Sequence, residues 1–220
     1  MKTPSYDLRP ARRHEVVALF EDNHGYASLS SSMTYCFAVR EAGRPIAAYA
    51  WQPPPPGTAR SVCPEAPQAV LSLSRMVAVP KQKPDGSPSR RLKHISKPLR
   101  RQMRQLIDRT RWPVLVTYSD EGEGHNGFVY ECSGWTPTVR SKRPVYENVD
   151  GARCSSYSNG RHGRRELVRA GFTWIQRWEN RVCAVGAAAD WMALHGWTRV
   201  ALPGRTWANG RQAHTYTRAA

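Results

Sequence analysis

The segment from Leu71 to Trp135 constrains the fold more strongly than any other part of this 220-residue chain. It opens with the apolar run LSLSRMVAVP and continues into a loop rich in Lys, Pro and Ser. Apolar residues then recur at the helical spacing of about 3.6 residues, and Trp112-Pro113 ends that pattern before the apolar run from Val114 to Tyr118. Strand, helix and strand in this order predict a βαβ unit whose strands pair in parallel.

The predicted helix in this unit is amphipathic. Ser96 is a residue type that caps helices, so we expect the helix to start there. The apolar positions that should pack on the sheet are Leu99, Met103, Leu106 and Ile107. Arg100, Arg101 and Arg104 fall on the opposite face and are expected to meet solvent.

The N-terminal part predicts a helix followed by a β-hairpin. Residues 12–21 carry apolar positions among charges, as in a short helix. Residues 35–40 and 45–51 flank a turn that contains Gly43, which is the pattern of a hairpin. The run 52–57 contains four prolines and is expected to be an extended, stiff connection, and residues 81–89 are expected to be an exposed loop.

Positive charge is concentrated in one part of the chain. Lys and Arg total 33 against 17 acidic residues, which gives a net charge of +16 and a pI near 10.3. Residues 81–111 hold eleven Lys and Arg and two acids, whereas residues 46–79 hold only Arg60 and Arg75 as basic residues. A generic solvated surface or a compositional bias towards Arg is the alternative, but this clustering favours a polyanionic partner.

The organisation expected from length is one domain with a large extension. We expect a core over residues 1–139 and a basic, Trp-containing extension over 140–220 that packs on the same domain. Within the extension, residues 159–165 are expected to form a loop, and residues 190–196 a short helix. No internal repeat is evident.

The cysteines and the apolar runs indicate the cellular compartment that we expect for the protein. Five cysteines without a C-x-x-C pair suggest neither a disulfide framework nor a zinc finger, so reduced, intracellular cysteines are expected. No apolar run approaches the roughly 18 residues that a membrane span needs, and the N-terminus lacks the apolar centre of a signal peptide. We expect a soluble, unsecreted protein that does not enter membranes.

The βαβ unit resembles that of GNAT acetyltransferases, whose loop (Q/R)-x-x-G-x-(G/A) binds the coenzyme A pyrophosphate at a helix N-terminus. Arg91-Leu-Lys-His94-Ile-Ser96 matches this loop in part, with His94 where Gly is usual and Ser96 where Gly or Ala is usual. Tyr130 precedes a Gly-Trp pair, as the late Tyr of that fold does. The resemblance implies an α/β (α+β) fold with a GNAT-like mixed central sheet flanked by helices. It also implies cofactor binding by Met76, Val77, Val79, Arg91, His94, Ser96 and Tyr130.

Longer strings resemble the Mom family of bacteriophage DNA-modification proteins. They are WQPPPPG at 51–57, SVCPEAP at 61–67, LSLSRMVAVP at 71–80, PLRRQM at 98–103 and TYSDEGEGHNGFVY at 117–130. The resemblance implies an enzyme that adds a carbamoylmethyl group to the exocyclic amine of adenine in DNA and so blocks host restriction. It further implies acetyl-CoA or another small donor, iron, and a place in the host cytoplasm.

Such a product joins nitrogen to a methylene carbon, for which a general base and an oxyanion hole are insufficient. A redox-active metal is one way to activate that carbon, and His24 and Asp120 are the first candidate iron ligands. Glu65, Glu121, Glu123 and His125 are further candidates, although such residues are more often satisfied polar groups. Besides His24 and Asp120, Tyr26 and Ser74 are candidate catalytic residues, with Arg75, Tyr118 and Ser119 nearby.

The expected macromolecular partner is double-stranded DNA with its adenine flipped out of the helix. Candidate phosphate contacts are Arg100, Arg101, Arg104, Arg140, Lys142 and Arg143. Trp174, Trp178 and Trp191 are either base-stacking residues or, as is commoner, core residues. Two alternatives stay open: a conventional N-acetyltransferase of a protein or small molecule, and a non-catalytic DNA-binding anti-restriction protein. The oligomeric state is not predicted.

Overall fold

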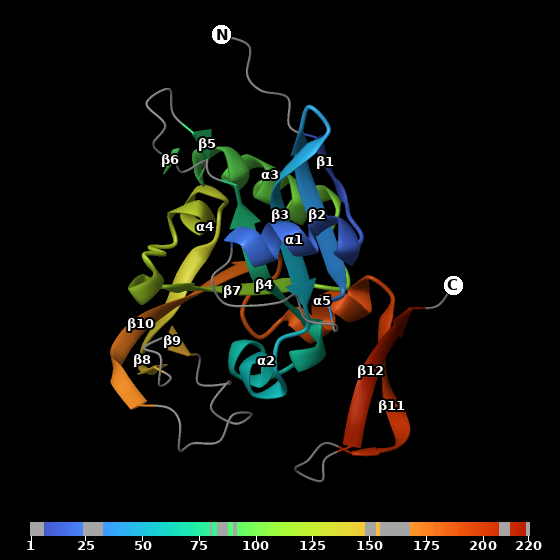
Figure 1. The fold of residues 1–220 in the computed structure, drawn as a ribbon. Coiled ribbons are helices and arrows are strands. Elements are labelled where there is room, and N and C mark those ends of the chain that lie inside the picture. The colour runs from blue at the N-terminus through green and yellow to red at the C-terminus, as the bar shows by residue number, and fades with distance from the viewer. Residues whose placement is uncertain are drawn as a thin grey trace.

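The computed structural model describes residues 7–23, 33–79, 81–82, 88–89, 92–147, 153–154, 168–206 and 212–218. For residues 81–82, 88–89, 92–94 and 153–154 it describes the backbone alone. An eight-stranded sheet runs through the molecule in the order β1-β2-β3-β4-β7-β10-β8-β9 (Figure 1). Its strands are β1 Asp7–Pro10, β2 Tyr35–Glu41, β3 Arg44–Gln52, β4 Val70–Ala78, β7 Val114–Asp120, β8 Thr136–Glu147, β9 Arg153–Cys154 and β10 Val168–Arg181.

The sheet is mixed because one of its neighbouring pairs, β4 and β7, is parallel, while the other pairs are antiparallel. The connection between β4 and β7 contains the long helix, as the sequence predicts for a βαβ unit. The helices are α1 Arg13–Asn23, α2 Pro56–Val62, η1 Pro67–Ala69, α3 Leu92–Gln105, η2 Glu121–Glu123, α4 Phe128–Cys132 and α5 Ala188–Leu194. Among the described residues, no helix has the length and apolar character needed to cross a membrane.

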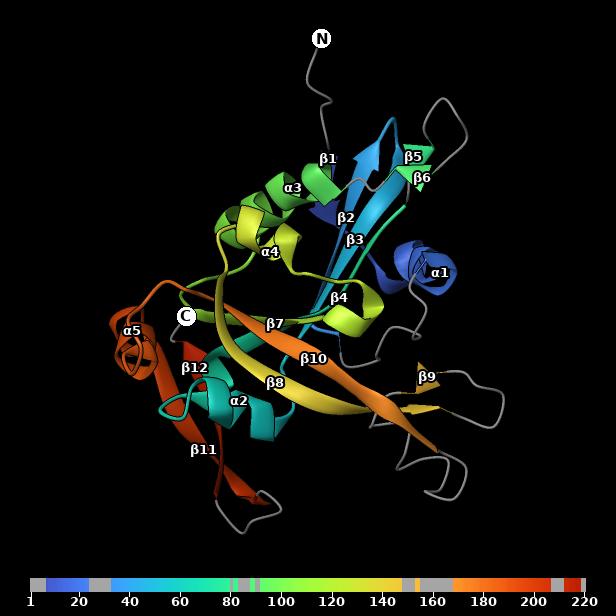
Figure 2. The ribbon, with the colours of Figure 1, turned by 90° about the vertical axis from the view of Figure 1, so that its left-hand side faces the viewer.

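Helices cover both faces of the sheet because its inner strands are apolar on both sides (Figure 2). On β3, Tyr49 and Trp51 pack in the same core cluster as the apolar residues of α3 and α4. Ala48 and Ala50 point to the other face, where they pack with Val16 and Phe20 of α1. A third cluster joins α2 and α5 to the start of β4 and β7 on the face opposite α3.

Helix α3 begins earlier than Ser96, so the predicted cap is wrong. The helix starts at Leu92, and Ser96 lies inside it, as does Pro98. The reason is tertiary: Ile95 is buried together with Leu99, which extends the packed face into the preceding turn. Pro98 lies inside the helix and lacks the backbone N–H that would donate to the carbonyl of His94. The buried Tyr49 hydroxyl donates to the carbonyl of Ile95 at 2.8 Å and ties this turn to β3.

Two of the predicted connections contain secondary structure. The proline run is extended only up to Pro55, and α2 then starts at Pro56, because proline suits the first position of a helix. The loop expected at 81–89 includes a pair of two-residue strands, β5 Lys81–Gln82 and β6 Pro88–Ser89. In both places a proline is the first residue of the element, Pro56 in α2 and Pro88 in β6, where its missing N–H is tolerated.

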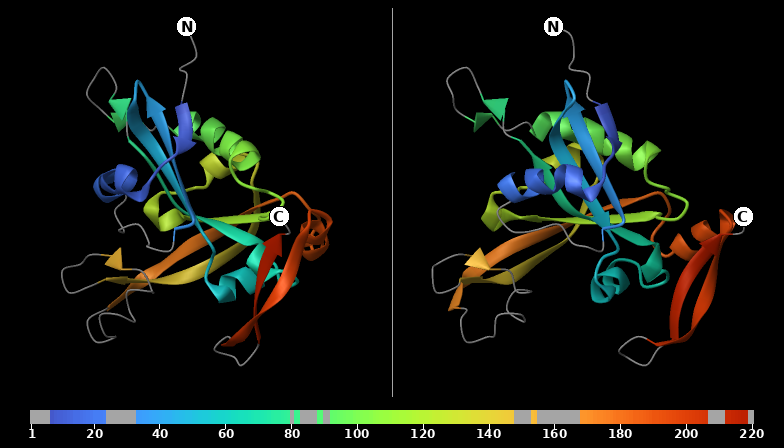
Figure 3. Two further views of the ribbon diagram at one scale, coloured as in Figure 1. Left: turned by 90° about the vertical axis from the view of Figure 1, so that its right-hand side faces the viewer. Right: turned by 45° about the vertical axis from the view of Figure 1, so that its right-hand side comes forward.

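The C-terminal third contributes to the sheet and also forms a separate hairpin. Strand β10 lies between β7 and β8, and the expected boundary at 139/140 falls inside β8. Strands β11 Trp197–Thr206 and β12 Gln212–Arg218 form a hairpin that projects from the sheet (Figure 3). The Arg111 guanidinium lies 4.1 Å from the Trp112 ring, 5.3 Å from Trp197 and 5.5 Å from Tyr216, which attaches the hairpin to the core.

Candidate active site between strands β4 and β7

The parallel strands β4 and β7 pair only at their start. Residues 70–72 lie opposite residues 114–116, and beyond that point the two strands diverge (Figure 2). Further along, β4 pairs only with β3, and β7 pairs only with β10, among the residues that the structure describes. Each strand therefore turns one edge with unpaired backbone groups towards the other, which is where a bound molecule can accept their hydrogen bonds.

A β-bulge in β4 lies where the strands diverge. Ala50 is opposite Arg75 and Trp51 is opposite Leu73, so Ser74 is the extra residue on β4. The Ser74 hydroxyl donates to the carbonyl of Ala50 at 3.1 Å. Arg75 Nη1 donates to the carbonyl of Ser74 at 2.8 Å, while its Nε is buried without a hydrogen-bond partner. Burial lowers the pKa of the Arg75 guanidinium, which marks it as a desolvated cation beside the diverging strands.

Two side chains join the strands just past their last paired residues. The hydroxyl of Thr117 on β7 donates to the carbonyl of Leu73 on β4 at 3.0 Å. Tyr130 on α4 is buried; burial raises its pKa, and a hydrogen bond with the Thr117 side chain lowers it in part. The two hydroxyls thus form a linked pair at the point where the strands diverge.

Two tryptophans pack against the Tyr130 ring. Its ring lies 5.9 Å from that of Trp135 and 6.0 Å from that of Trp178. Trp178 donates to the hydroxyl of Ser119 at 2.9 Å. Gly127 has a positive φ of +78°, and a Cβ there would lie 2.1 Å from the Trp178 ring, so only glycine allows this loop to cover the indole.

Of the β4 residues predicted to bind the cofactor, Val77 and Val79 direct their backbone groups towards β3, whereas Met76 directs its backbone groups towards β7. The N–H of Val79 donates to the carbonyl of Ile46 on β3, and Val77 lies directly opposite Ala48. Since backbone groups alternate between the two edges of a strand, Met76 and Ala78 direct theirs towards the edge facing β7. Met76 therefore lies as a cofactor-binding residue would, and Ala78 is a residue that the sequence reasoning missed.

The predicted pyrophosphate loop is described only in part. Arg91 lies outside the described residues, and of His94 only the backbone in the first turn of α3 is described. Ser96 is buried, and its carbonyl accepts a hydrogen bond from the Ser133 hydroxyl at 3.1 Å. The role of these three residues in binding a cofactor stays a prediction.

Asp120 lies at the end of β7, as predicted, and acts there as a helix cap. One of its carboxylate oxygens accepts hydrogen bonds from the N–H of Gly122, at 3.0 Å, and from the Thr173 hydroxyl. His24 and Tyr26 lie outside the described residues. No group of three or more His, Cys, Asp and Glu side chains in the described part of the chain can hold a metal ion. The described residues do not fit an iron site.

The reserve ligands do not gather around Asp120. Glu65 lies in the network with Cys63 and Arg181 that connects α2 to β10. Burial would raise the pKa of Glu65, but hydrogen bonds from backbone N–H groups and from Cys63 lower it overall. Glu121 forms an exposed ion pair with Arg140 at 2.8 Å, and His125 is exposed. Glu123 lies in η2 and is half-buried.

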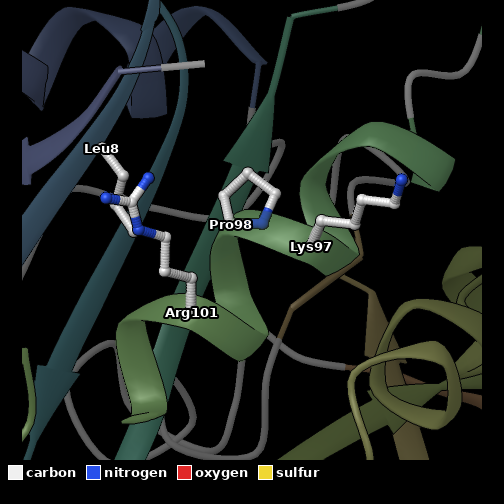
Figure 4. Close-up of a pocket in the computed structure, with 4 residues that line it drawn as sticks. All are labelled: Leu8, Lys97, Pro98 and Arg101. Carbon is white, nitrogen blue, oxygen red and sulfur yellow. The ribbon is translucent and has the colours of Figure 1, made fainter. Parts of the chain in front are cut away.

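Basic side chains predicted to bind DNA lie in two places. Arg100, Arg101 and Arg104 are exposed on the outer side of α3. Leu8, Lys97, Pro98 and Arg101 line a small pocket of about 180 Å³ between β1 and α3 (Figure 4). Arg140, Lys142 and Arg143 lie on β8, on the opposite side of the diverging strands from β1. The structure therefore presents two separate basic surfaces, and DNA binding by either stays a prediction.

A comparison with protein families identifies the relationship. The model of the Mom protein family matches residues 5–182. The chain belongs to the Mom protein family. No curated protein matches the sequence. The matched part of this Mom family member includes the whole eight-stranded sheet and ends before α5 and the β11–β12 hairpin.

Solved acetyltransferases resemble the fold of this Mom family member. A probable acetyltransferase from Staphylococcus epidermidis ATCC 12228 has a TM-score of 0.50 and 8% identity, over 81% of this chain and 100% of that one. The IAA acetyltransferase from Bacillus cereus ATCC 14579 has a TM-score of 0.48 and 11% identity, over 81% and 100%. A GNAT family acetyltransferase from Elizabethkingia anophelis with acetyl-CoA bound has a TM-score of 0.41 and 10% identity, over 78% and 96%. The predicted GNAT-like fold is confirmed; at these identities the likeness concerns the fold alone.

Three site residues were missed by sequence reasoning. Thr117 bridges the strands, Tyr49 binds the first turn of α3, and Ala78 directs its backbone to the open edge. Thr117 is the first polar residue after the apolar run 114–116, which is the one signal that pointed to it. The other two are ordinary strand residues whose roles depend on the register with β3.

Proposed function

We propose that this Mom family member transfers a carbamoylmethyl group to the exocyclic amine of adenine in DNA and thereby protects that DNA from restriction. The observation that carries the proposal is the match to the Mom family over residues 5–182. The divergence of β4 and β7 supports it, because these strands leave unpaired backbone groups at which a small donor can be held. The net charge of +16 supports a polyanionic substrate.

The reaction forms a bond between the adenine nitrogen and a methylene carbon. It breaks the bond between that carbon and a leaving group on the donor, and the nitrogen loses a proton. In this proposal Tyr130 and Thr117 hold the donor between the strands, where the Tyr130 hydroxyl remains protonated. Arg75, whose Nε has no hydrogen-bond partner, binds the carbonyl oxygen of the group that is transferred.

Adenine in a duplex cannot reach this point unless it leaves the base stack. A flipped base needs a protein surface that binds the adjoining backbone and compensates the cost of unstacking, which is a few kcal/mol. The exposed cations of α3 or of β8 are suited to that task. We propose that the backbone groups of Met76 and Ala78 bind the small donor on the other side of the diverging strands.

Mass spectrometry of nucleosides tests the proposal directly. DNA from cells that express the protein is digested, and deoxyadenosine is examined for an added carbamoylmethyl group. Modified deoxyadenosine is expected. Unmodified DNA together with newly acetylated peptides or amines would favour the conventional N-acetyltransferase, and unmodified DNA that the protein nevertheless binds would favour a non-catalytic anti-restriction protein.

Variants of the site give the second readout. Tyr130→Phe and Arg75→Lys are expected to reduce the modified fraction about tenfold or more, since a single well-placed donor contributes on that scale. Arg205→Ala, in the exposed β11–β12 hairpin, is the control with an unchanged modified fraction. If Tyr130→Phe and Arg75→Lys both modify DNA as the wild type does, the diverging strands are not the site.

The donor and the metal are tested separately. Labelled acetate that appears in the modified base would support an acetyl-CoA donor, whereas label from glycine alone would exclude it. Elemental analysis of the purified protein tests for iron, and the His24→Ala and Asp120→Ala variants test the two predicted ligands. Retention of bound iron by both variants would remove them as ligands.

A further inference from the structure

The outer part of the β8–β10 pair carries aromatic and basic side chains on one face. Phe172 and Trp174 alternate along β10, so they share a face, and the register places Trp174 opposite Lys142 and Phe172 opposite Pro144. Arg140 and Lys142 alternate in the same way along β8. We call the set Arg140, Lys142, Arg169, Phe172 and Trp174 the aromatic–basic face.

Cations lie over both rings of this face. The Phe172 ring is approached by Lys142 Nζ at 4.5 Å and by the Arg169 guanidinium at 4.2 Å. The Arg140 guanidinium lies 4.6 Å from the Trp174 ring. These contacts leave the rings largely accessible, since Phe172 is 51% exposed and Trp174 is 41% exposed. In the part of the chain that the structure describes, two large aromatic side chains therefore lie on a sheet surface without a hydrophobic cover.

Two of the cations around these rings have no carboxylate partner among the described residues. Arg140 is paired with Glu121, at 2.8 Å, in an exposed ion pair. Within the described residues, no carboxylate pairs with Lys142 or Arg169, although both approach the same ring. Like charges held close together without a counter-ion favour an anion between them. A surface that combines unpaired cations with accessible rings matches nucleic acid, whose phosphates and bases satisfy both kinds of group.

The aromatic–basic face also lies next to the candidate active site. β10 pairs with β7 up to Asp120, which is opposite Ile175, the residue after Trp174. The Thr173 hydroxyl donates to the Asp120 carboxylate, so the two strands are joined at this point. A DNA strand that crosses this face therefore reaches the end of β7, beyond the point where β7 diverges from β4.

We propose that the aromatic–basic face binds the nucleotides adjoining the flipped adenine, with Phe172 and Trp174 stacking on exposed bases and Lys142 and Arg169 contacting phosphates. This inference rests on the proposed function, because it assumes that DNA is the substrate. On binding, each cation leaves its ring for a phosphate and a base takes its place. Residues two apart on a strand are separated by about 7 Å, close to twice the spacing of about 3.4 Å between stacked bases.

Fluorescence anisotropy with a short labelled DNA tests the proposal. The probes are a fully paired duplex and the same duplex with one unpaired adenine, each measured over a range of salt concentrations. Wild type is expected to bind the duplex with the unpaired adenine more tightly. The Phe172→Ala/Trp174→Ala double variant is expected to lose about tenfold or more of that affinity, since stacking contributes on this scale for each base.

Conservative and matched variants separate stacking from folding and from charge. Trp174→Phe keeps an aromatic face and should bind close to wild type. Lys142→Ala should weaken binding to both probes alike and reduce the salt dependence by about one phosphate contact. Arg205→Ala, an equal loss of charge in the β11–β12 hairpin, should leave binding unchanged. Circular dichroism confirms that each variant is folded.

The outcomes distinguish this inference from the proposed function. If wild type modifies adenine and the double variant binds both probes as wild type does, the inference is wrong while the function stands. If wild type neither binds nor modifies DNA, both are wrong. If the double variant instead loses binding to anionic lipid vesicles while its DNA binding is unchanged, the face serves a membrane surface and the inference is likewise wrong.

Discussion

Trp178 and Trp174 lie four residues apart on the same face of β10, yet their surroundings are opposite. Trp178 is 6% exposed, packs against Tyr130, and is covered by the loop at Gly127. Trp174 is 41% exposed and has only the Arg140 guanidinium over its ring. The same residue type on the same face of one strand therefore belongs to the core in one half of β10 and to the surface in the other.

What separates the two halves is the element that lies above each. Over the inner half, α4 and its preceding loop supply apolar side chains and a glycine that tolerates close contact. The outer half extends past the end of β7, and in the described residues β8 pairs with it and η2 contacts it through Thr173. An amphipathic side chain thus stabilises the fold in one place and remains available to a ligand in the other.

The largest expected effect is that of Trp178→Ala. Removing a buried indole costs about 3–5 kcal/mol of unfolding free energy, because the cavity cannot be refilled. Urea denaturation measures the change in midpoint at constant slope. Gly127→Ala tests the same contact from the loop and should also destabilise, since the added methyl would meet the Trp178 ring at positive φ. A loss below about 1 kcal/mol for Trp178→Ala would contradict the conclusion that Trp178 is a core residue.

The second prediction compares an inner with an outer ion pair. Glu179 is 6% exposed, accepts a hydrogen bond from Arg181 Nε at 2.7 Å and forms an ion pair with Arg177 Nε at 3.0 Å. Glu179→Gln should cost about 3 kcal/mol, because it leaves two partly buried guanidinium groups without their anion. The exposed pair of Glu121 and Arg140 gives the control: Glu121→Gln should change stability by less than about 0.5 kcal/mol. Equal losses in urea denaturation would contradict the distinction.

A third prediction concerns the bridge between β4 and β7. Thr117→Val keeps the shape of the side chain but leaves the carbonyl of Leu73 without the hydroxyl that now binds it. The expected loss is about 1–2 kcal/mol, the cost of an unsatisfied buried acceptor. Thr198→Val, at an exposed position of β11, serves as the matched control. No difference between the two in urea denaturation would show that the bridge does not stabilise the diverging strands.

The smallest expected effect on stability is that of Trp174→Ala. Its exposed cation–π contact is worth about 0.5 kcal/mol, so the urea midpoint should shift little. The same variant is expected to lower DNA affinity more strongly, so it separates the role of Trp174 in binding from its role in stability. A loss as large as that of Trp178→Ala would place Trp174 in the core and remove it from the aromatic–basic face.

The sequence predicted the central unit of the fold better than its periphery. The strands at 70–79 and 114–118, the hairpin at 35–51 and the helix at 12–21 are confirmed because their apolar spacing is unambiguous. The start of α3 was wrong, since a cap signal at Ser96 yielded to the burial of Ile95. The long strands β8 and β10 were missed because their exposed halves do not alternate between apolar and polar residues.

The candidate site was predictable only at the level of segments. Asp120 and Tyr130 were placed at a strand end and late in the fold, as the structure has them. That Asp120 caps η2, and that Tyr130 contacts Thr117, depends on side chains distant in sequence. Glu65 was a further candidate ligand after His24 and Asp120, and it lies in the network beside Arg181.

Periodicity, which is a local property, thus determined the βαβ unit and the outward-facing arginines of α3, and the sequence strings that resemble the Mom family indicated the family that the family model shows. The bulge at Ser74, the short parallel pairing of β4 with β7, and the opposite environments of Trp174 and Trp178 were decided by tertiary contacts. The physical reason is that strand register and coverage depend on which distant surface packs against each residue, and a single strand carries no record of that partner.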